Sequence, residues 1–258
     1  MARHDSVVVL VGFGASSEEA RRVYAQIEQR IRTFVPECAV RWAFTSGRIV
    51  AKLRGEGVVL PTLAEAIEEL ERDRVETAVF QPLLTVPGQE YAKLQQLVGN
   101  NGRFRVGAPL LASSRDIGEV VEALAPSLRN DRINIVVCHG NRRHEEYNLL
   151  LLELASDLES RYANVVVASV EGSPGLTSLE RARELARKTG SVHFVPFMLV
   201  AGEHIRHDVM GDHPESWKNR VGAARVTCAA PLGATPAAMN LYLRRLKTAL
   251  EESAAQCR

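Results

Sequence analysis

The sequence predicts an α/β protein made of two similar parallel-sheet lobes that face a central cleft. Short β-branched runs alternate with amphipathic segments along the chain, a pattern typical of parallel sheets covered by helices. The first run, residues 7–11, is apolar throughout, as expected of a strand buried on both faces. The order of elements restarts after the polar stretch 127–132, which indicates an internal duplication.

The elements follow one another in a regular order. The strand at 7–11 ends in Gly12-Phe13-Gly14, and Ser16-Ser17-Glu18-Glu19 marks the start of a helix that continues to about residue 34. The first half continues with a strand at 39–44, a helix at 63–72, strands at 77–84 and 105–111, and a helix at 116–128. The second half has a strand at 133–138, a helix at 145–161, a strand at 165–170, a helix at 178–188, strands at 192–199 and 224–230, and a helix from about 236 to 254. We therefore expect an N-terminal lobe at 1–128 and a C-terminal lobe at 129–258, with the last helix a candidate to pack back on the first lobe.

The duplication rests on three matches in the same order. Segment 79–90 aligns without a gap over 193–204, Gly12-Phe13-Gly14 aligns over Cys138-His139-Gly140, and 108–110 aligns over 230–232. Under this alignment Phe13 becomes His139 and Glu90 becomes His204. Ligands of open parallel sheets bind beyond the carboxyl ends of the strands, where both differences lie. The second half has therefore gained two imidazoles at positions where sites are built.

Composition excludes several classes of protein. The chain has 258 residues, 46% hydrophobic and 24% charged, and a net charge of +1, so we expect neither a nucleic-acid nor a membrane partner. The first residues show no signal-peptide cleavage pattern, and the four scattered cysteines form no CxxC pair, which is typical of a cytoplasmic protein. The GxG after the first strand lacks the third glycine of a dinucleotide fingerprint, and no Walker-type GK[ST] is present.

Three strands of the second half are each followed by a potential metal ligand: His139, Glu171 and His204. Two imidazoles and one carboxylate suit a borderline divalent ion such as cobalt, nickel, iron or zinc. A strand-end histidine taken alone is more often structural, so the spacing itself predicts a metal or acid–base site without choosing between them. His207 and His213 are expected at the surface, with His207 placed to assist His204.

Several segments resemble the anaerobic cobalt chelatases of the CbiK type, class II chelatases related in fold to ferrochelatase. The resemblance covers nearly the whole chain and is carried by the stretches 41–53, 81–91, 106–113, 139–140, 170–175 and, most distinctively, 196–218. It implies chelatase-like, flavodoxin-like halves. It also implies that His139, Glu171 and His204 bind the metal and that Glu90 faces the tetrapyrrole pocket. Cys138 departs from the glycine that many relatives have before the histidine.

The resemblance implies a lyase that inserts Co²⁺ into sirohydrochlorin, or precorrin-2, in anaerobic cobalamin biosynthesis. The metal is a substrate, Ni²⁺ and Fe²⁺ stay open, and no organic cofactor is expected. His139 and Glu90 are the expected catalytic residues, and the expected substrate-binding residues are Phe13, Ser16, Arg48, Glu90 and Arg206. A ferro- or nickel-chelatase of a related tetrapyrrole, a non-catalytic tetrapyrrole or metal carrier, and a small-molecule sensor remain alternatives, and a homo-oligomer is left open.

Overall fold

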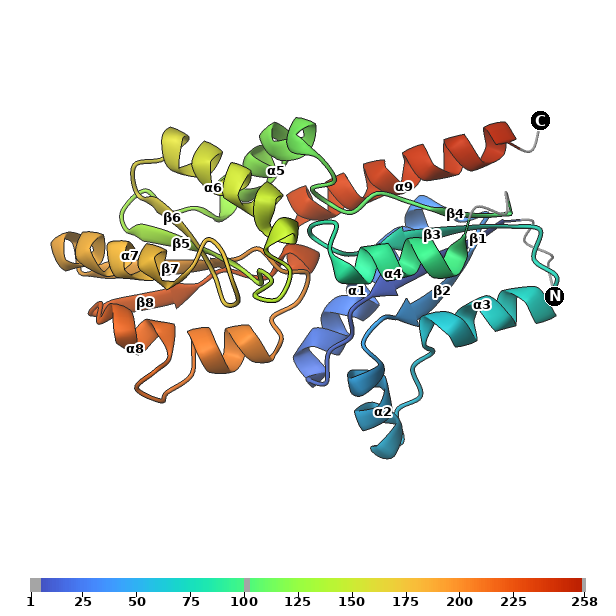
Figure 1. Cartoon of the computed structure of the whole chain (residues 1–258), viewed down its shortest axis with the longest axis horizontal. Coiled ribbons are helices and arrows are strands. Elements are labelled where there is room, and N and C mark those ends of the chain that lie inside the picture. The colour runs from blue at the N-terminus through green and yellow to red at the C-terminus, as the bar shows by residue number, and fades with distance from the viewer. Residues whose placement is uncertain (1–5, 100–102, 257–258) are drawn as a thin grey trace. The chain divides into compact units, whose positions relative to one another are not determined.

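The computed structural model describes residues 6–99 and 103–256, which divide into two compact units (Figure 1). The first unit contains the residues up to 112 and those from 239 onward, and the second contains residues 113–238. The helix expected at 116–128 therefore lies in the second unit, although the sequence placed it in the N-terminal lobe. Compactness alone does not define a folding unit, so the division at 128 and 129 stays a prediction, as does the cleft between the lobes.

Each unit is built on a four-stranded parallel sheet, which confirms the predicted α/β class. The first sheet contains β1 (Ser6–Gly12), β2 (Ala39–Phe44), β3 (Thr77–Pro82) and β4 (Phe104–Val106), in the order β2-β1-β3-β4. The second contains β5 (Ile133–Cys138), β6 (Val165–Ser169), β7 (Ser191–Pro196) and β8 (Arg225–Cys228), in the order β6-β5-β7-β8. The two orders are the same when the strands of each half are numbered in sequence.

The two units also share the register of their strands, as a duplication requires. Val9 lies opposite Phe80 in the first sheet, and Ile135 lies opposite Phe194 in the second. The hydrogen bonds beyond the strand ends match as well. The amide of Ser46 donates to the carbonyl of Phe13 at 3.1 Å, and in the second unit Glu171 donates to His139 at 2.8 Å.

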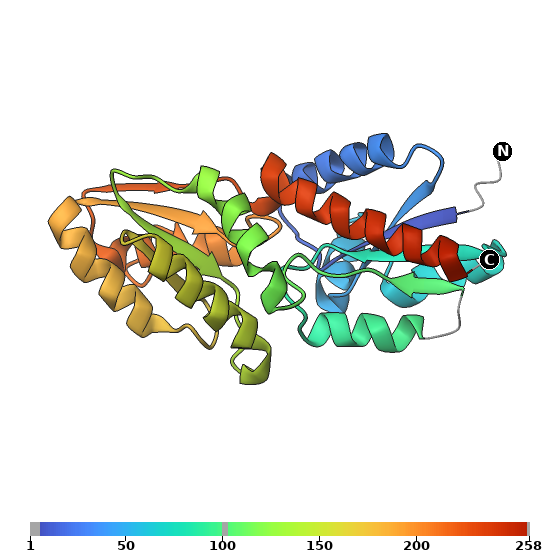
Figure 2. The same cartoon turned by 90° about the horizontal axis from the view of Figure 1, so that it is seen from above.

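The helices of the first unit lie on both faces of its sheet. They are α1 (Glu18–Phe34), α2 (Gly47–Gly55), α3 (Leu63–Arg72), α4 (Gln89–Val98) and α9 (Pro236–Gln256). Buried side chains of α3 and α4, including Leu70 and Leu94, pack with Phe80 against one face. Helices α1 and α9 lie on the other side of this sheet from α4 (Figure 2). Helix α9 is held there by Tyr242, whose hydroxyl donates to the carbonyl of Leu84 at 3.2 Å.

The second unit has the same layered construction. Its helices are η1 (Ser114–Asp116), α5 (Ile117–Leu124), η2 (Ala125–Ser127), η3 (Glu145–Asn148), α6 (Leu149–Arg161), α7 (Leu176–Thr189), the π-helix η4 (His204–Val209), α8 (Trp217–Val221) and η5 (Leu232–Ala234). A single buried cluster joins α7, η4 and α8 to β5, β6 and β7. Among the described residues, no helix has both the length and the apolarity needed to cross a lipid bilayer.

Several elements differ from the prediction. Helices α2, α4, α8 and η4 were not predicted, and the strands expected at 77–84, 105–111, 192–199 and 224–230 are shorter in the structure. Helix α4 is preceded by Gly88, which makes no side-chain cap hydrogen bond, so the helix lacks the usual start signal. Strands β3 and β7 both end at a proline, Pro82 and Pro196, because proline cannot donate to the sheet.

Candidate metal centre

Two imidazoles come together at the carboxyl ends of neighbouring strands in the second unit. His139 directly follows β5, and His204 begins η4 a short loop after β7. Their ring centroids are 4.8 Å apart, and the ring planes meet at 81°. His139 is exposed and His204 is partly exposed, so solvent and small ligands have access to both rings. The structure therefore pairs two of the three residues that the sequence singled out as metal ligands.

Hydrogen bonds define which nitrogen each ring offers. Nδ1 of His139 lies 2.8 Å from the carbonyl oxygen of Gly140, and Nδ1 of His204 lies 2.6 Å from Oδ2 of Asp208. Carbonyl and carboxylate oxygens only accept, so both Nδ1 atoms carry the hydrogen. In the neutral imidazoles the lone pair is then on Nε2, which is the nitrogen free to bind a metal ion.

Asp208 links His204 to a second histidine. Its Oδ1 accepts from Nδ1 of His207 at 2.9 Å while Oδ2 accepts from His204. Partial burial raises the pKa of Asp208, but the hydrogen bonds and the electrostatic attraction of His207 and His204 together lower it by more, so the pKa lies below its ordinary value. Asp208 is therefore an ionised acceptor shared by two imidazoles at neutral pH.

The loops after β5 and β6 are packed against each other through two glycines. Gly140 has a φ of +71°, and a Cβ there would overlap the backbone carbonyl oxygen of Glu171. Gly172 has a φ of +72°, and a Cβ there would overlap the carbonyl of Asn141. Only glycine adopts this backbone conformation readily and leaves room for so close an approach. This packing places the backbone of Glu171 directly beside that of His139.

Asn148 holds the loop after β5 in place through two hydrogen bonds. It is 1% exposed, its Oδ1 accepts from the amide of Asn141 at 2.8 Å, and its Nδ2 donates to the carbonyl of the same residue at 2.8 Å. A buried side-chain amide whose oxygen and nitrogen both have hydrogen-bond partners fixes the loop rigidly.

Sequence reasoning missed both Asn148 and Asp208. The spacing of His204 and Asp208, four residues apart, was the available signal for Asp208.

Glu171 is not joined to the two imidazoles. Across residues 6–99 and 103–256, no three or more His, Cys, Asp or Glu side chains are arranged to hold a metal ion. Glu171 is partly buried near the start of the loop after β6, and its backbone amide donates to the carbonyl of His139. Its role as a third ligand stays a prediction, as do the ligand roles of His139 and His204.

Two predicted substrate residues of the first unit, Phe13 and Glu90, occupy positions that match His139 and His204 of the second. Phe13 stands at the His139 position and is 46% exposed, while Ser46 stands at the Glu171 position. Glu90, in the first turn of α4, has a buried Oε2 without a hydrogen-bond partner among the described residues. Arg48 is exposed in α2, and Ser16 precedes Ser17, the residue that caps α1.

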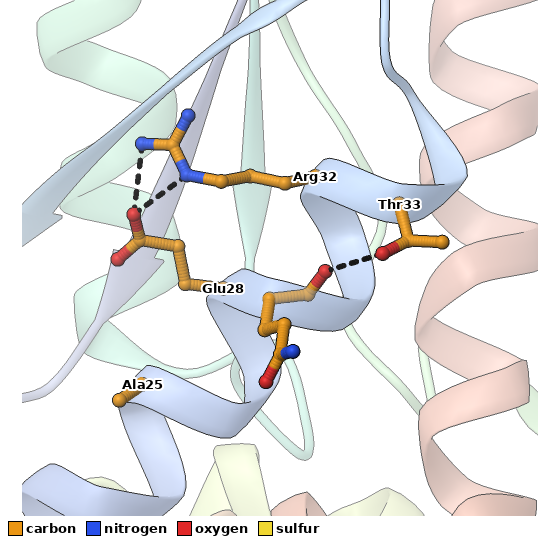
Figure 3. Close-up of a pocket in the computed structure, with 5 residues that line it drawn as sticks. Ala25, Glu28, Arg32 and Thr33 are labelled. Atoms are coloured by element: carbon orange, nitrogen blue, oxygen red, sulfur yellow. Dashed lines mark hydrogen bonds and ion pairs between the residues drawn. The ribbon is translucent and has the colours of Figure 1, made fainter.

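A hollow on α1 offers no alternative site. Figure 3 shows its lining residues, all from one helix, and none of them is a predicted site residue. Arg32 pairs with Glu28 at 2.8 Å, and the other oxygen of Glu28 accepts from Trp42 at 2.8 Å. The hydroxyl of Thr33 donates to the carbonyl of Gln29 at 3.0 Å. The charged groups that line the hollow are thus already paired within the protein.

Arg206, which was predicted to bind substrate, is exposed on η4 of the second unit.

Fold and site together define a class: a duplicated parallel-sheet protein in which one half carries paired imidazoles suited to a divalent metal. The profile of the family described as cobalt chelatase (CbiK) matches residues 6–251. The chain belongs to this family of metal chelatases.

Named relatives agree with this membership. The sirohydrochlorin cobaltochelatase of Salmonella typhimurium is 30% identical over 255 residues, covering 94% of this chain and 96% of that protein. The sirohydrochlorin cobaltochelatase CbiKC of Nitratidesulfovibrio vulgaris is 27% identical over 238 residues, covering 88% and 83%.

Solved structures share the fold at much lower identity. SirB from Bacillus subtilis with Fe³⁺ has a TM-score of 0.65 at 14% identity and covers 97% of this chain and 98% of that one. The sirohydrochlorin chelatase SirB from Bacillus subtilis subspecies spizizenii in complex with cobalt has a TM-score of 0.62 at 15% identity, with 97% of both chains covered. These similarities establish a common two-lobed chelatase fold.

Proposed function

We propose that this chain is a sirohydrochlorin cobaltochelatase, which inserts Co²⁺ into the ring and releases two pyrrole protons. Membership of the cobalt chelatase family and the two named relatives support this activity. The observation that carries it in the structure is the His139–His204 pair, with ring centroids 4.8 Å apart and the Nδ1 atom of each ring hydrogen-bonded to an oxygen, which leaves the lone pair on Nε2.

The proposed chemistry begins with metal capture. Nε2 of His139 and Nε2 of His204 bind the ion, and the carboxylate of Glu171 is the proposed third ligand. Two neutral imidazoles and one carboxylate leave the loaded centre with a net charge of about +1, which permits release where three carboxylates would retain the ion. Imidazole nitrogen suits Co²⁺ as well as Ni²⁺ and Fe²⁺, so Co²⁺ is proposed on the family and the relatives.

Proton removal follows from the same residues. When the ion moves into the ring, the lone pair on Nε2 of His139 becomes free, and it takes one of the two pyrrole protons. Glu90 is the proposed acceptor of the other, because its Oε2 has no hydrogen-bond partner among the described residues. Phe13, Ser16, Arg48 and Arg206 are the further proposed tetrapyrrole-binding residues, the two arginines through the ring's peripheral carboxylates.

The enzyme is proposed to work in the cytoplasm without an organic cofactor. Its proposed ring is sirohydrochlorin, with precorrin-2 as the alternative. A carrier of the same ligands is the competing class, and it differs in stoichiometry: a carrier takes up one equivalent per chain, whereas an enzyme converts many.

The test is anaerobic turnover followed by visible absorption, with sirohydrochlorin and Co²⁺, Ni²⁺ or Fe²⁺ offered separately. We expect multiple turnovers that are fastest with Co²⁺. His139→Ala should lower turnover by about 10²–10⁴-fold, the range for a lost general base, and His204→Ala should also lose activity. The matched control is His144→Ala, a partly exposed histidine of the same unit that pairs with Glu146 and should leave turnover unchanged. Conversion that stops at one equivalent, or near-normal rates in both alanine variants, would overturn the proposal.

A further inference from the structure

The π-helix η4 presents one apolar and one polar face. Ile205 and Val209 are 4% and 0% exposed and belong to the buried cluster of the second unit, together with Trp217 of α8. These anchors fix the helix against the sheet. His204, His207 and Asp208 lie on the remaining, partly exposed surface. Single π-turns are rare and occur often at functional sites, so the local geometry calls for an explanation.

The carboxylate of Asp208 is fully engaged by two imidazoles. Oδ2 accepts from His204 at 2.6 Å, a short contact typical of a charge-assisted hydrogen bond, and Oδ1 accepts from His207 at 2.9 Å. Because each oxygen accepts from a different ring, the orientation of the carboxylate is fixed at both of its oxygens. The carboxylate in turn sets the rotation of the His204 ring.

His207 is itself held in place. Its backbone carbonyl accepts from Nε2 of His213 at 2.9 Å, and the two rings stack with centroids 4.4 Å apart. The same carbonyl lies so close to Gly211 that a Cβ there would overlap it. The chain therefore packs tightly around His207. This packing keeps the His207 ring in position to donate to Asp208, the carboxylate that also accepts from His204.

We propose that Asp208 is a positioning residue of the metal centre, which holds the His204 ring through Nδ1–H so that Nε2 is kept for the metal ion. This inference rests on the proposed function, since it takes His204 as a ligand. His139 needs no such residue, because the carbonyl of Gly140 performs the same task from the backbone. Without the carboxylate, the ring of His204 is free to rotate and to carry its hydrogen on Nε2, where it would block the ion.

The experiment measures Co²⁺ affinity of the full-length, metal-free protein without tetrapyrrole, by titration of the ligand-field absorption of Co²⁺. Asp208→Asn and Asp208→Ala should each weaken Co²⁺ binding by about 10–100-fold, the usual cost of losing the partner of a ligating histidine. His207→Ala should weaken it less, because the bond between Asp208 and His204 remains. The matched control is Asp212→Asn, which removes a fully exposed carboxylate paired with Lys218 and should bind Co²⁺ as the parent does.

A second readout separates positioning from general stability. The ¹⁵N resonances of the His204 imidazole should show hydrogen on Nδ1 in the parent protein and a mixture of tautomers in Asp208→Ala. The thermal midpoint of the metal-free Asp208→Asn variant should stay near that of the parent. A merely structural role would lower the midpoint without changing the tautomer.

The outcomes distinguish this inference from the function on which it rests. If Asp208→Asn and Asp208→Ala bind Co²⁺ like the parent while His204→Ala does not, Asp208 is not a positioning residue and the metal centre stands. If His204→Ala also binds Co²⁺ normally, His204 is not a ligand, and the proposed metal centre fails with it.

Discussion

Gly140 is the residue on which the placement of His139 depends most directly. Its backbone is in the left-handed region, and the carbonyl oxygen of Glu171 occupies the space where a side chain would begin. The amide of Glu171 donates back to the carbonyl of His139 at 2.8 Å. The histidine and the loop after β6 are thus fixed to one another only as long as residue 140 has no Cβ.

Gly140→Ala should therefore destabilise the protein and displace His139. A non-glycine residue in this backbone region costs about 1–3 kcal/mol, and the overlap with Glu171 adds to it. We expect a lower midpoint in denaturant unfolding and weaker Co²⁺ binding. Gly118→Ala is the control, because nothing lies within 4 Å of its added Cβ and alanine favours helix α5. Parent-like Co²⁺ affinity in Gly140→Ala would show that His139 binds the ion even when the loops after β5 and β6 are pushed apart.

At the scale of elements, regular helices were predictable and the π-helix was not. Helix α1 was expected to start near residues 16–19 and to end near 34, and it spans Glu18–Phe34 with Ser17 as its cap. Its apolar periodicity and its capping residue are local signals. The π-turn of η4 has no such local signal, and its Ile205 and Val209 are buried in one cluster with residues of α7 and α8 that lie outside the turn. The pairing of His204 with Asp208 had only their four-residue spacing as a signal, and that spacing alone does not establish a contact.

Ile205→Ala tests whether this packing supports the metal centre. Loss of a buried isoleucine side chain should destabilise the protein by about 2–5 kcal/mol, measured by denaturant unfolding. Because Ile205 neighbours His204 and anchors η4, Co²⁺ binding should weaken as well. Ile205→Val keeps most of the packing and should cost only about 0.5–1.5 kcal/mol. If the alanine variant unfolds earlier but binds Co²⁺ unchanged, the helix does not need this anchor to place its polar face.

At the scale of the whole molecule, the duplicated halves exchange helices along the chain. Strand β4 of the first unit is followed by α5 in the second unit, and β8 of the second unit is followed by α9, most of which lies in the first. The repeat itself was readable from aligned strand ends, so the two sheets and the paired histidines were predictable. This exchange was not, because the repeat shows which elements correspond but not which sheet each helix covers.

Divergence between the halves leads to a prediction about the number of metal ions. The first unit has Phe13 and Glu90 where the second has His139 and His204, and it has Ser46 at the position of Glu171. A phenylalanine and a serine supply no nitrogen ligand, so Co²⁺ should bind with one equivalent per chain. Equilibrium titration should show this stoichiometry, and His139→Ala should abolish it.

Glu90→Gln should then separate the two halves in function. Its buried Oε2 lacks a partner among the described residues, which suits the proposed acceptor of a pyrrole proton. We expect unchanged Co²⁺ affinity and stoichiometry, with insertion slowed by about 10²–10⁴-fold, as for a lost general base. Glu68→Gln, on α3 of the same unit, is the control and should insert Co²⁺ at the parent rate. Weaker Co²⁺ binding in Glu90→Gln would instead make this carboxylate a metal ligand, and the duplication would then have left a functional ligand in each half.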